Sequence, residues 1–544
     1  MIIWRTGIAA VLVLAAPLAA RTVVVNANGY TLDDAGALKR FGTLVVGDDG
    51  RVEATLAKGV VAPAGTVIDA KGATVLPGLI DAHGHIMELG YQALSVDLTG
   101  TTSLAAALAQ VKAYAKANPN ARWIVGGGWN QEIWKLGRFP TAAELDAAVG
   151  DRPVYLHRVD GHAGWTNSAG LRAAGVTAAT ADPAGGRIER GPGGAPSGVF
   201  VDGAQQLVES HMPKPTPAEA IAALDKALAI MASVGLTGAA DMGIDPATWK
   251  LYHYFETNHR LTARITAMAG GIDALHAIAP NGPVDWSGDE RLSLPGVKLY
   301  DDGALGSRGA WLKADYSDAP GNRGLQFHSD AELRGSVDDA TRHGFQVATH
   351  AIGDAANAQV LDAYARVPAA QRQTLRLRIE HAQILDPADL PRFAALGVIA
   401  SMQPTHATSD KNMAENRLGA ARLAGAYAWK TLIDSGARFA GGSDFPVESP
   451  NPFYGLYSAV TRQDHEGNPP AGWRSAEKLT PVQALAAFTT GAAHAAHAET
   501  RVGTLTPGKW ADFIIVDHDL FAGDPATIWQ TKVSQTWVGG KRVF

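Results

Sequence analysis

The chain of 544 residues contains no cysteine. Disulfides, thiolate metal sites and cysteine nucleophiles are therefore excluded, and any bound metal must be held by nitrogen and oxygen atoms. There is no Lys/Arg-rich run, internal repeat or coiled-coil heptad, and the formal net charge is only -6. This composition gives no indication of a nucleic-acid partner or a fibrous role. With 46% hydrophobic residues, the chain can bury a large core in more than one structural unit.

The chain also lacks an apolar run long enough to span a membrane comfortably. Its first 20 residues combine Arg5, an apolar stretch over 7–16 and small residues up to Ala20. This order is typical of a secretory signal peptide. We expect residues 1–20 to be cleaved, which leaves a periplasmic or secreted protein with no stable membrane anchor. An N-terminal strand or an uncleaved anchor is the alternative.

Both ends of the remaining chain contain β-branched runs separated by Gly, Asp and Asn turns. Such runs occur at 22–25, 43–46 and 66–68, and again at 511–517 and 533–538. Unpaired, these segments would leave exposed strand edges. We therefore predict that residues 21–74 and 500–544 pair into one small β-sandwich.

Between the two ends, eight short apolar segments alternate with Ala- and Leu-rich helical segments such as 217–234, 331–343 and 355–366. The apolar segments are Val75–Asp81, Leu236–Asp241, Ala263–Ala269, Val297–Tyr300, Phe345–Thr349, Leu377–Glu380, Val398–Ser401 and Arg438–Ala440. This alternation predicts an α/β fold, a (β/α)8 TIM barrel over 75–499. Its active site is expected at the carboxyl ends of the strands.

A long insertion, residues 95–215, separates the first and second predicted strands. It contains strand-like segments at 123–125 and 154–156, and we interpret it as a lid-like subdomain. Its glycine runs, 126–128 and 191–194, lack the strand–GxGxxG–helix context of a dinucleotide site and are expected to be turns.

Polar residues follow several of the predicted strands directly. His83 and His85 are two residues apart, so on an extended chain both imidazoles face the same side and can reach one cation. The complete set is His83, His85, Lys298, His350, His381 and Asp444. The alternative is ordinary surface histidines, of which a chain with 17 must have many, and a lysine snorkelling from a strand end.

The segments around these residues resemble the amidohydrolase superfamily, in particular the YtcJ-like branch that includes N-substituted formamide deformylases. The matching segments are 77–85, 298–310, 349–354, 380–381 and 442–446, with 160–168 and 198–205 in the insertion. The resemblance extends over nearly all of the mature chain.

The resemblance implies a binuclear centre. His83 and His85 would bind the first metal, His350 and His381 the second, and an N6-carboxylated Lys298 would bridge them. Asp444 would bind the first metal and act as the catalytic general base. A site of nitrogen and oxygen donors suits two zinc ions, with manganese, cobalt or iron as alternatives. Without carboxylation of Lys298, the site would hold one metal.

Four loop residues are candidates for contact with a small-molecule substrate: Arg308, His162, Trp129 and His406. For each, an ordinary role in loop structure is the alternative. The expected function is hydrolysis of a non-peptide C–N bond, most simply an amide of the N-acyl or N-formyl amine type. Ester, lactone or carbamate hydrolysis and a non-catalytic periplasmic binding protein remain open, as do the substrate itself and homo-oligomerisation.

Overall fold

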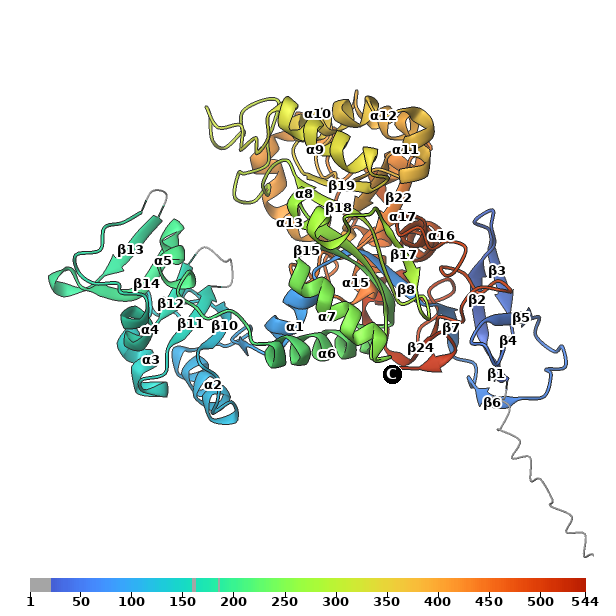
Figure 1. The fold of residues 1–544 in the computed structure, drawn as a ribbon, viewed down its shortest axis with the longest axis horizontal. Helices are drawn as coiled ribbons and strands as arrows, with labels where there is room; N and C mark the ends of the chain where they lie inside the picture. Colours follow the sequence, from blue (N-terminus) through green and yellow to red (C-terminus); the bar gives the residue numbers. More distant parts are fainter. Residues whose placement is uncertain (1–20, 159–162, 184–185) are drawn as a thin grey trace, which may run out of the picture. The chain divides into compact units, whose positions relative to one another are not determined.

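The computed structural model describes residues 21–158, 163–183 and 186–544. The expected signal peptide, residues 1–20, lies outside the described residues and stays a prediction. The chain divides into two compact units. One contains the chain up to residue 84 together with 229–544, and the other contains 85–228. Each unit is described by itself (Figure 1).

The larger unit is built around a parallel sheet in which eight barrel strands are neighbours in the order of the chain. These strands are β8 (Leu79–Gly84), β15 (Leu236–Ile244), β16 (Arg264–Gly270), β18 (Leu292–Tyr300), β19 (Gln346–Ala351), β20 (Arg378–His381), β21 (Ile399–Met402) and β22 (Arg438–Gly441). The segment after β22 returns to β8, because the N–H of Asp444 donates to the carbonyl of His83 at 2.7 Å and Gly84 forms a parallel bridge with Phe445. The predicted (β/α)8 barrel is confirmed.

Helices alternate with the barrel strands, and Figure 1 shows α9 to α12 on the outside of the sheet. The helices are α7 (Pro246–Thr257), α8 (Ile272–Ile278), α9 (Asp330–Arg342), α10 (Asp354–Ala365), α11 (Ala369–Leu375), α12 (Leu390–Leu396), α13 (Pro404–Leu418), α14 (Trp429–Asp434), α15 (Pro452–Thr461), α16 (Pro481–Ala486) and α17 (Ala492–Ala495). Helix α6 (Pro217–Ser233) precedes β15, and the short strand β17 (Val284–Ser287) pairs antiparallel with β18. Helix α9 begins with a capping box, in which Ser329 and Glu332 each accept the other's main-chain N–H.

The single strand predicted over Val75–Asp81 is in fact two strands. Residues Thr74–Pro77 form β7, which belongs to the sandwich, and β8 starts at Leu79. The chain turns between them at Gly78, where an added Cβ would lie 2.3 Å from the side chain of Thr237. A periodicity of apolar residues cannot reveal this break, because both strands are buried.

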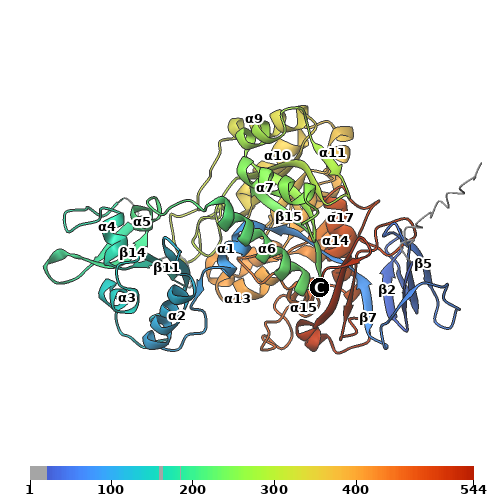
Figure 2. The same cartoon turned by 60° about the horizontal axis from the view of Figure 1, so that its bottom comes forward.

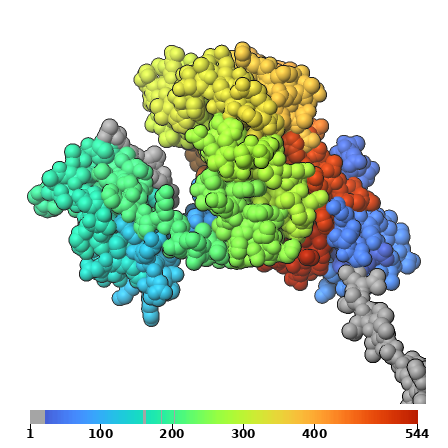
Figure 3. Space-filling view, viewed as in Figure 1, coloured from blue at the N-terminus to red at the C-terminus, as the bar shows by residue number. Residues whose placement is uncertain are grey.

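The two chain ends pair into a β-sandwich, as predicted. One sheet has the order β5-β4-β1-β6 and the other β25-β24-β23-β7-β2-β3. The strands are β1 (Thr22–Val25), β2 (Asn28–Leu32), β3 (Leu38–Phe41), β4 (Thr43–Val46), β5 (Val52–Leu56), β6 (Thr66–Asp69), β23 (Phe513–Val516), β24 (Val533–Val538) and β25 (Lys541–Arg542). Figures 2 and 3 show the N-terminal segment in blue against the C-terminal segment in red. Its core combines Val24, Leu44 and Val75 with Phe513 and Ile515, so neither end buries its apolar face alone.

The smaller unit, residues 85–228, has its own six-stranded sheet of order β13-β14-β12-β11-β10-β9. Its elements are α1 (Ile86–Ala93), β9 (Val96–Asp97), α2 (Leu104–Ala117), β10 (Ile124–Trp129), α3 (Ala142–Val149), β11 (Val154–Arg158), β12 (Ala163–Thr166), α4 (Ser168–Ala173), β13 (Gly186–Arg190), β14 (Pro196–Asp202) and α5 (Gln206–Glu209). The expectation of a turn at Gly126–Gly128 is wrong, because these glycines lie inside β10. A Cβ on Gly126 would meet the carbonyl of Val96 at 2.1 Å, so the neighbouring strand requires glycine there. The role of this unit as a lid stays a prediction.

Among the described residues, no helix is both long enough and apolar enough to cross a membrane.

A buried ion pair connects the barrel to the sandwich. Arg264, on β16, donates Nε to one oxygen of Asp512 at 2.7 Å and Nη2 to the other at 3.0 Å. Asp512 lies directly before β23, and both side chains are only 4% exposed. Such a pair is costly to break, because the remaining charge stays buried without its partner.

We therefore predict that Asp512→Ala lowers the free energy of unfolding by about 3–5 kcal/mol. Denaturant unfolding followed by circular dichroism measures the change. The matched control is Arg334→Ala, which removes an exposed pair with Asp330 and is expected to cost under about 1 kcal/mol. Equal effects of the two substitutions would show that the Arg264–Asp512 pair contributes no more to the free energy of unfolding than an exposed ion pair.

Candidate metal centre

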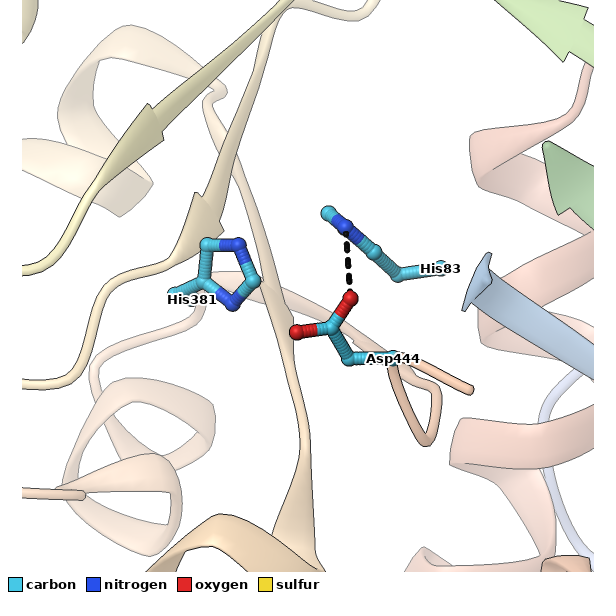
Figure 4. Close-up of side chains that lie close together, drawn as sticks. All are labelled: His83, His381 and Asp444. Atoms are coloured by element: carbon cyan, nitrogen blue, oxygen red, sulfur yellow. Dashed lines mark ion pairs between the residues drawn. The ribbon is translucent and has the colours of Figure 1, made fainter. Parts of the chain in front are cut away.

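Three buried side chains from separate parts of the barrel meet at the carboxyl ends of its strands. They are His83 from β8, His381 from β20 and Asp444 from the loop after β22, and one ligand atom from each lies within 4.8 Å of the others. His83 Nε2 is 3.4 Å from Asp444 Oδ1. Figure 4 shows the three side chains pointing into one space.

Two further predicted residues extend this cluster. Lys298 Nζ lies 3.2 Å from His83 Nε2, and Lys298 is almost completely buried on β18. The ring of His350, on β19, is 4.5 Å from that of His381, measured between centroids. Five of the six predicted ligands are thus gathered from β8, β18, β19, β20 and the loop after β22.

The backbone is strained at two of these positions. His381 has a φ of 72° and Asp444 a φ of 60°, a left-handed conformation that most residues other than glycine avoid. Such conformations persist only where surrounding structure enforces them, and they concentrate at functional sites. At Asp444 the enforcing contact is the hydrogen bond to the carbonyl of His83 that closes the barrel.

Buried polar partners set the tautomers of two histidines. His83 Nδ1 donates to Glu380 Oε2 at 2.6 Å, and a carboxylate can only accept, so the lone pair of His83 lies on Nε2. Glu380 is in turn held by Arg378 through bonds of 2.6 and 3.1 Å. His381 Nδ1 lies 2.9 Å from Gln403 Oε1, which likewise leaves Nε2 of His381 as the ligand atom. A carboxylate behind a histidine is the usual support for a metal ligand.

Asp81 joins two of the ligand-bearing segments. Its carboxylate accepts the main-chain N–H of His83 at 3.0 Å and the hydroxyl of Ser443 at 2.6 Å. Burial raises the pKa of Asp81 to about 7. The side chain therefore fixes the distance between β8 and the loop that carries Asp444.

Burial also determines the charge of the nitrogen groups. It lowers the pKa of His83 to about 4 and that of His350 to about 3, with the charge of Lys298 as the next cause in both. Burial lowers the pKa of Lys298 to about 8. Although burial alone would raise it, Arg378 and the bond from His83 hold the pKa of Glu380 well below its ordinary value. At neutral pH the imidazoles are uncharged, which is the form that binds a metal.

This donor set fits a divalent cation. Within the described part of the chain, His350 Nε2 is buried and makes no hydrogen bond, although Asp302 Oδ1 lies 3.5 Å away. A buried polar atom without a partner is expensive unless something else occupies its lone pair. Neutral imidazoles and a carboxylate, gathered in one buried cluster, are typical ligands of zinc and its neighbours.

Comparison with known proteins agrees with this geometry. The profile of an amidohydrolase family, Amidohydro_3, matches residues 66–544. The chain belongs to the amidohydrolase family. It is 35% identical to the putative amidohydrolase YtcJ of Bacillus subtilis, over 88% of this chain and 90% of that protein. It is 27% identical to the N-substituted formamide deformylase of Arthrobacter pascens, over 95% of this chain and 97% of that protein.

Among solved structures, an uncharacterized metal-dependent hydrolase from Pyrococcus horikoshii superposes on this amidohydrolase with a TM-score of 0.78. The two are 27% identical, and the match covers 93% of this chain and 99% of the other. The predicted membership of the YtcJ-like branch is thereby confirmed.

The remaining predicted site residues of the amidohydrolase have different surroundings. His85 is the first residue of the 85–228 unit, and its ligand role stays a prediction. His162 lies outside the described residues. Arg308 forms a bidentate ion pair with Asp318, through bonds of 3.1 and 3.0 Å, and its contact with substrate stays a prediction.

Trp129 is a core residue. It is fully buried in the 85–228 unit against Trp134 and Trp165, and its indole N–H donates to the carbonyl of Leu156 at 2.7 Å. A buried indole with its N–H paired has no surface to offer a substrate. The prediction of a substrate contact at Trp129 is therefore replaced by a packing role.

Sequence reasoning missed the residues that hold the ligands in place. These are Asp81, Arg378, Glu380 and Gln403. One signal was available in Arg378 and Glu380. Two opposite charges two residues apart in a buried strand must be paired. That the pair would support His83, almost 300 residues earlier in the chain, follows only from the fold.

We predict that Glu380→Gln weakens metal binding by about 10- to 100-fold, since the amide no longer holds His83 with the same charge or tautomer. Competition with a chromogenic chelator measures the affinity. The matched control is Glu477→Gln, because Glu477 is also buried and accepts bonds from Thr431 but lies on the short 3-10 helix η4 (Ser475–Glu477), outside the ligand cluster. An unchanged affinity in Glu380→Gln with a lowered melting temperature would assign Glu380 a purely structural role.

Proposed function

We propose that this amidohydrolase is a metal-dependent enzyme that hydrolyses the C–N bond of small non-peptide amides, of the N-acyl or N-formyl amine type. The observation that carries the proposal is the buried cluster of His83, His381 and Asp444, joined by Lys298 and His350 at the mouth of the barrel. The similarity to a formamide deformylase over nearly the whole chain supports an amide as the substrate class.

His83, His350, His381 and Asp444 would hold the metal, with His85 as a further ligand of the first ion. We propose two zinc ions, bridged by Lys298 after carboxylation of its amine. When bound, such ions make hydroxide available from water at neutral pH and polarise a carbonyl oxygen. His83, His381 and Asp444 are buried, so the charges of the site would be screened little by solvent.

Asp444 is proposed as the general base and acid. Its carboxylate stands at the strand ends beside His83, so it can accept the proton of the attacking water and return it to the leaving nitrogen. The carboxylate lies in the cluster with His83 and His381. Asp444 would thus carry the proton from water to the leaving nitrogen.

Activity of the metal-loaded protein tests the proposal. Metal-stripped protein is reconstituted with zinc, manganese or cobalt and assayed on formanilides, acetanilides, nitrophenyl esters and lactones. The proposal requires metal-dependent release of amine from at least one amide, faster than hydrolysis of the matching ester. Hydrolysis of esters or lactones alone would replace the amide assignment. No turnover of any class would support a binding protein.

We predict that Asp444→Asn retains metal and lowers kcat by about 10²- to 10⁴-fold, because the amide cannot accept the proton of water. Elemental analysis reports the metal and amine release reports the rate. Asp434→Asn, an exposed carboxylate on α14, is the control and should leave both unchanged. Full activity in Asp444→Asn would rule out the proposed base.

For Lys298, we predict that Lys298→Ala reduces the bound metal from about two ions per chain to one, since the bridging oxygens are lost. Protein prepared in ¹³C-bicarbonate should show a carbamate carbon by NMR, and the variant should not. Lys411→Ala is the control, because Lys411 is also largely buried but is paired with Asp464. Two tightly bound ions in Lys298→Ala would exclude the bridge.

A further inference from the structure

His406 is a buried histidine that faces the cluster without being part of it. It lies in the first turn of α13 and is 8% exposed. Its Nε2 is 3.7 Å from Asp444 Oδ2, and its ring is nearly parallel to that of His381, with 6.0 Å between centroids. In the described part of the chain, Nε2 is buried and makes no hydrogen bond. This ring nitrogen therefore faces the carboxylate of Asp444.

The opposite ring nitrogen is occupied. Gln383 Nε2 lies 3.0 Å from His406 Nδ1. An amide NH2 can donate but cannot accept, so Nδ1 must be the acceptor in this pair. The imidazole then carries its hydrogen on Nε2, the atom that faces Asp444. His406 is thus presented to the site as a hydrogen-bond donor.

Gln383 is itself held on several sides. It follows β20 by two residues, and its main-chain carbonyl accepts the N–H of Tyr427 at 2.6 Å. The Tyr427 hydroxyl lies 3.5 Å from Gln383 Oε1 and donates to Asp410 Oδ2 at 2.5 Å. Both Gln383 and Tyr427 are buried. In the structure the amide oxygen of Gln383 lies on the tyrosine side and its NH2 group faces the imidazole of His406.

We propose that His406 is a catalytic residue whose Nε2–H binds the substrate carbonyl oxygen as it becomes an oxyanion, and that Gln383 is the positioning residue that fixes the required tautomer. This inference rests on the proposed function. A neutral imidazole with its hydrogen directed at a carbonyl is an effective electrophile, because no other proton must move for it to act. A donor prearranged for developing charge in a buried site acts in the same way.

The reaction balances with His406 unchanged. Water gives one proton to Asp444 while its oxygen bonds to the carbonyl carbon, and the carbonyl oxygen gains negative charge within reach of Nε2–H. The C–N bond then breaks, and Asp444 returns the proton to the nitrogen. The products are a carboxylic acid and an amine, and His406 keeps its hydrogen throughout.

The first test compares His406→Phe with His406→Gln. Phenylalanine keeps the ring without a donor, whereas glutamine places an amide N–H at a similar reach. With 4-nitroacetanilide, we expect kcat to fall by about 10²- to 10³-fold in His406→Phe, with a smaller change in KM and partial recovery in His406→Gln. Metal content must stay equal to that of the unaltered protein. Loss of metal in His406→Phe would make His406 a ligand and overturn the inference, as would an unchanged kcat.

The second test is a double-mutant cycle with Gln383→Leu. If Gln383 acts through His406, Gln383→Leu lowers kcat on its own but lowers it no further in the His406→Phe background. If Gln383 had a merely structural role, Gln383→Leu would lower kcat by the same factor with His406 and with Phe at position 406. Additive losses would therefore remove Gln383 from the proposal.

Binding of methylphosphonate, a tetrahedral anion, gives a readout besides activity. We expect its Kd, measured by calorimetry, to rise by about tenfold or more in His406→Phe and to recover partly in His406→Gln. If amides are not hydrolysed but 4-nitrophenyl acetate is, the proposed function fails while the kinetic test of His406 proceeds on the ester. If no substrate is hydrolysed, the Kd of methylphosphonate alone tests the role of His406. Equal affinity, or binding by neither protein, overturns the role of His406.

Discussion

A main-chain hydrogen bond at the closure of the barrel also brings two site residues together. The N–H of Asp444 donates to the carbonyl of His83, which joins the first barrel strand to the segment after the last. The backbone therefore brings together the side chains of His83, a candidate metal ligand, and Asp444, the proposed general base. Asp81 strengthens the junction, because one carboxylate binds both the His83 main chain and Ser443.

The buried polar groups around this junction have two roles: some face the centre of the cluster, and others hold those groups in place. Nε2 of His83 and His381 faces the centre, while Glu380 and Gln403 hold the opposite nitrogens. Arg378 then neutralises Glu380. In a low-dielectric interior an unpaired member of such a network would be strongly destabilising, so each group constrains the next. His406 follows the same rule, with Gln383 in the supporting position.

Much of this could be predicted from the chain alone. Alternating apolar segments and helices predicted the barrel, and the β-branched ends predicted the sandwich. Local patterns failed where a distant segment determines the conformation. Gly126–Gly128 reads as a turn but lies inside strand β10, where Val96 of the neighbouring strand comes too close to Gly126 for a side chain. Trp129 reads as a loop residue but fills a core whose other members come from separate elements.

The sequence by itself determined which residues end the barrel strands, because strand length and polarity are local properties. It therefore determined that His83, Lys298, His350, His381 and Asp444 would share one end of the barrel. Only the tertiary structure decided which nitrogen of each histidine faces the centre. That choice depends on Glu380, Gln403 and Gln383, whose contacts join residues far apart in the chain or across different strands. Hydrogen-bond partners of this kind are set by packing, which no local pattern encodes.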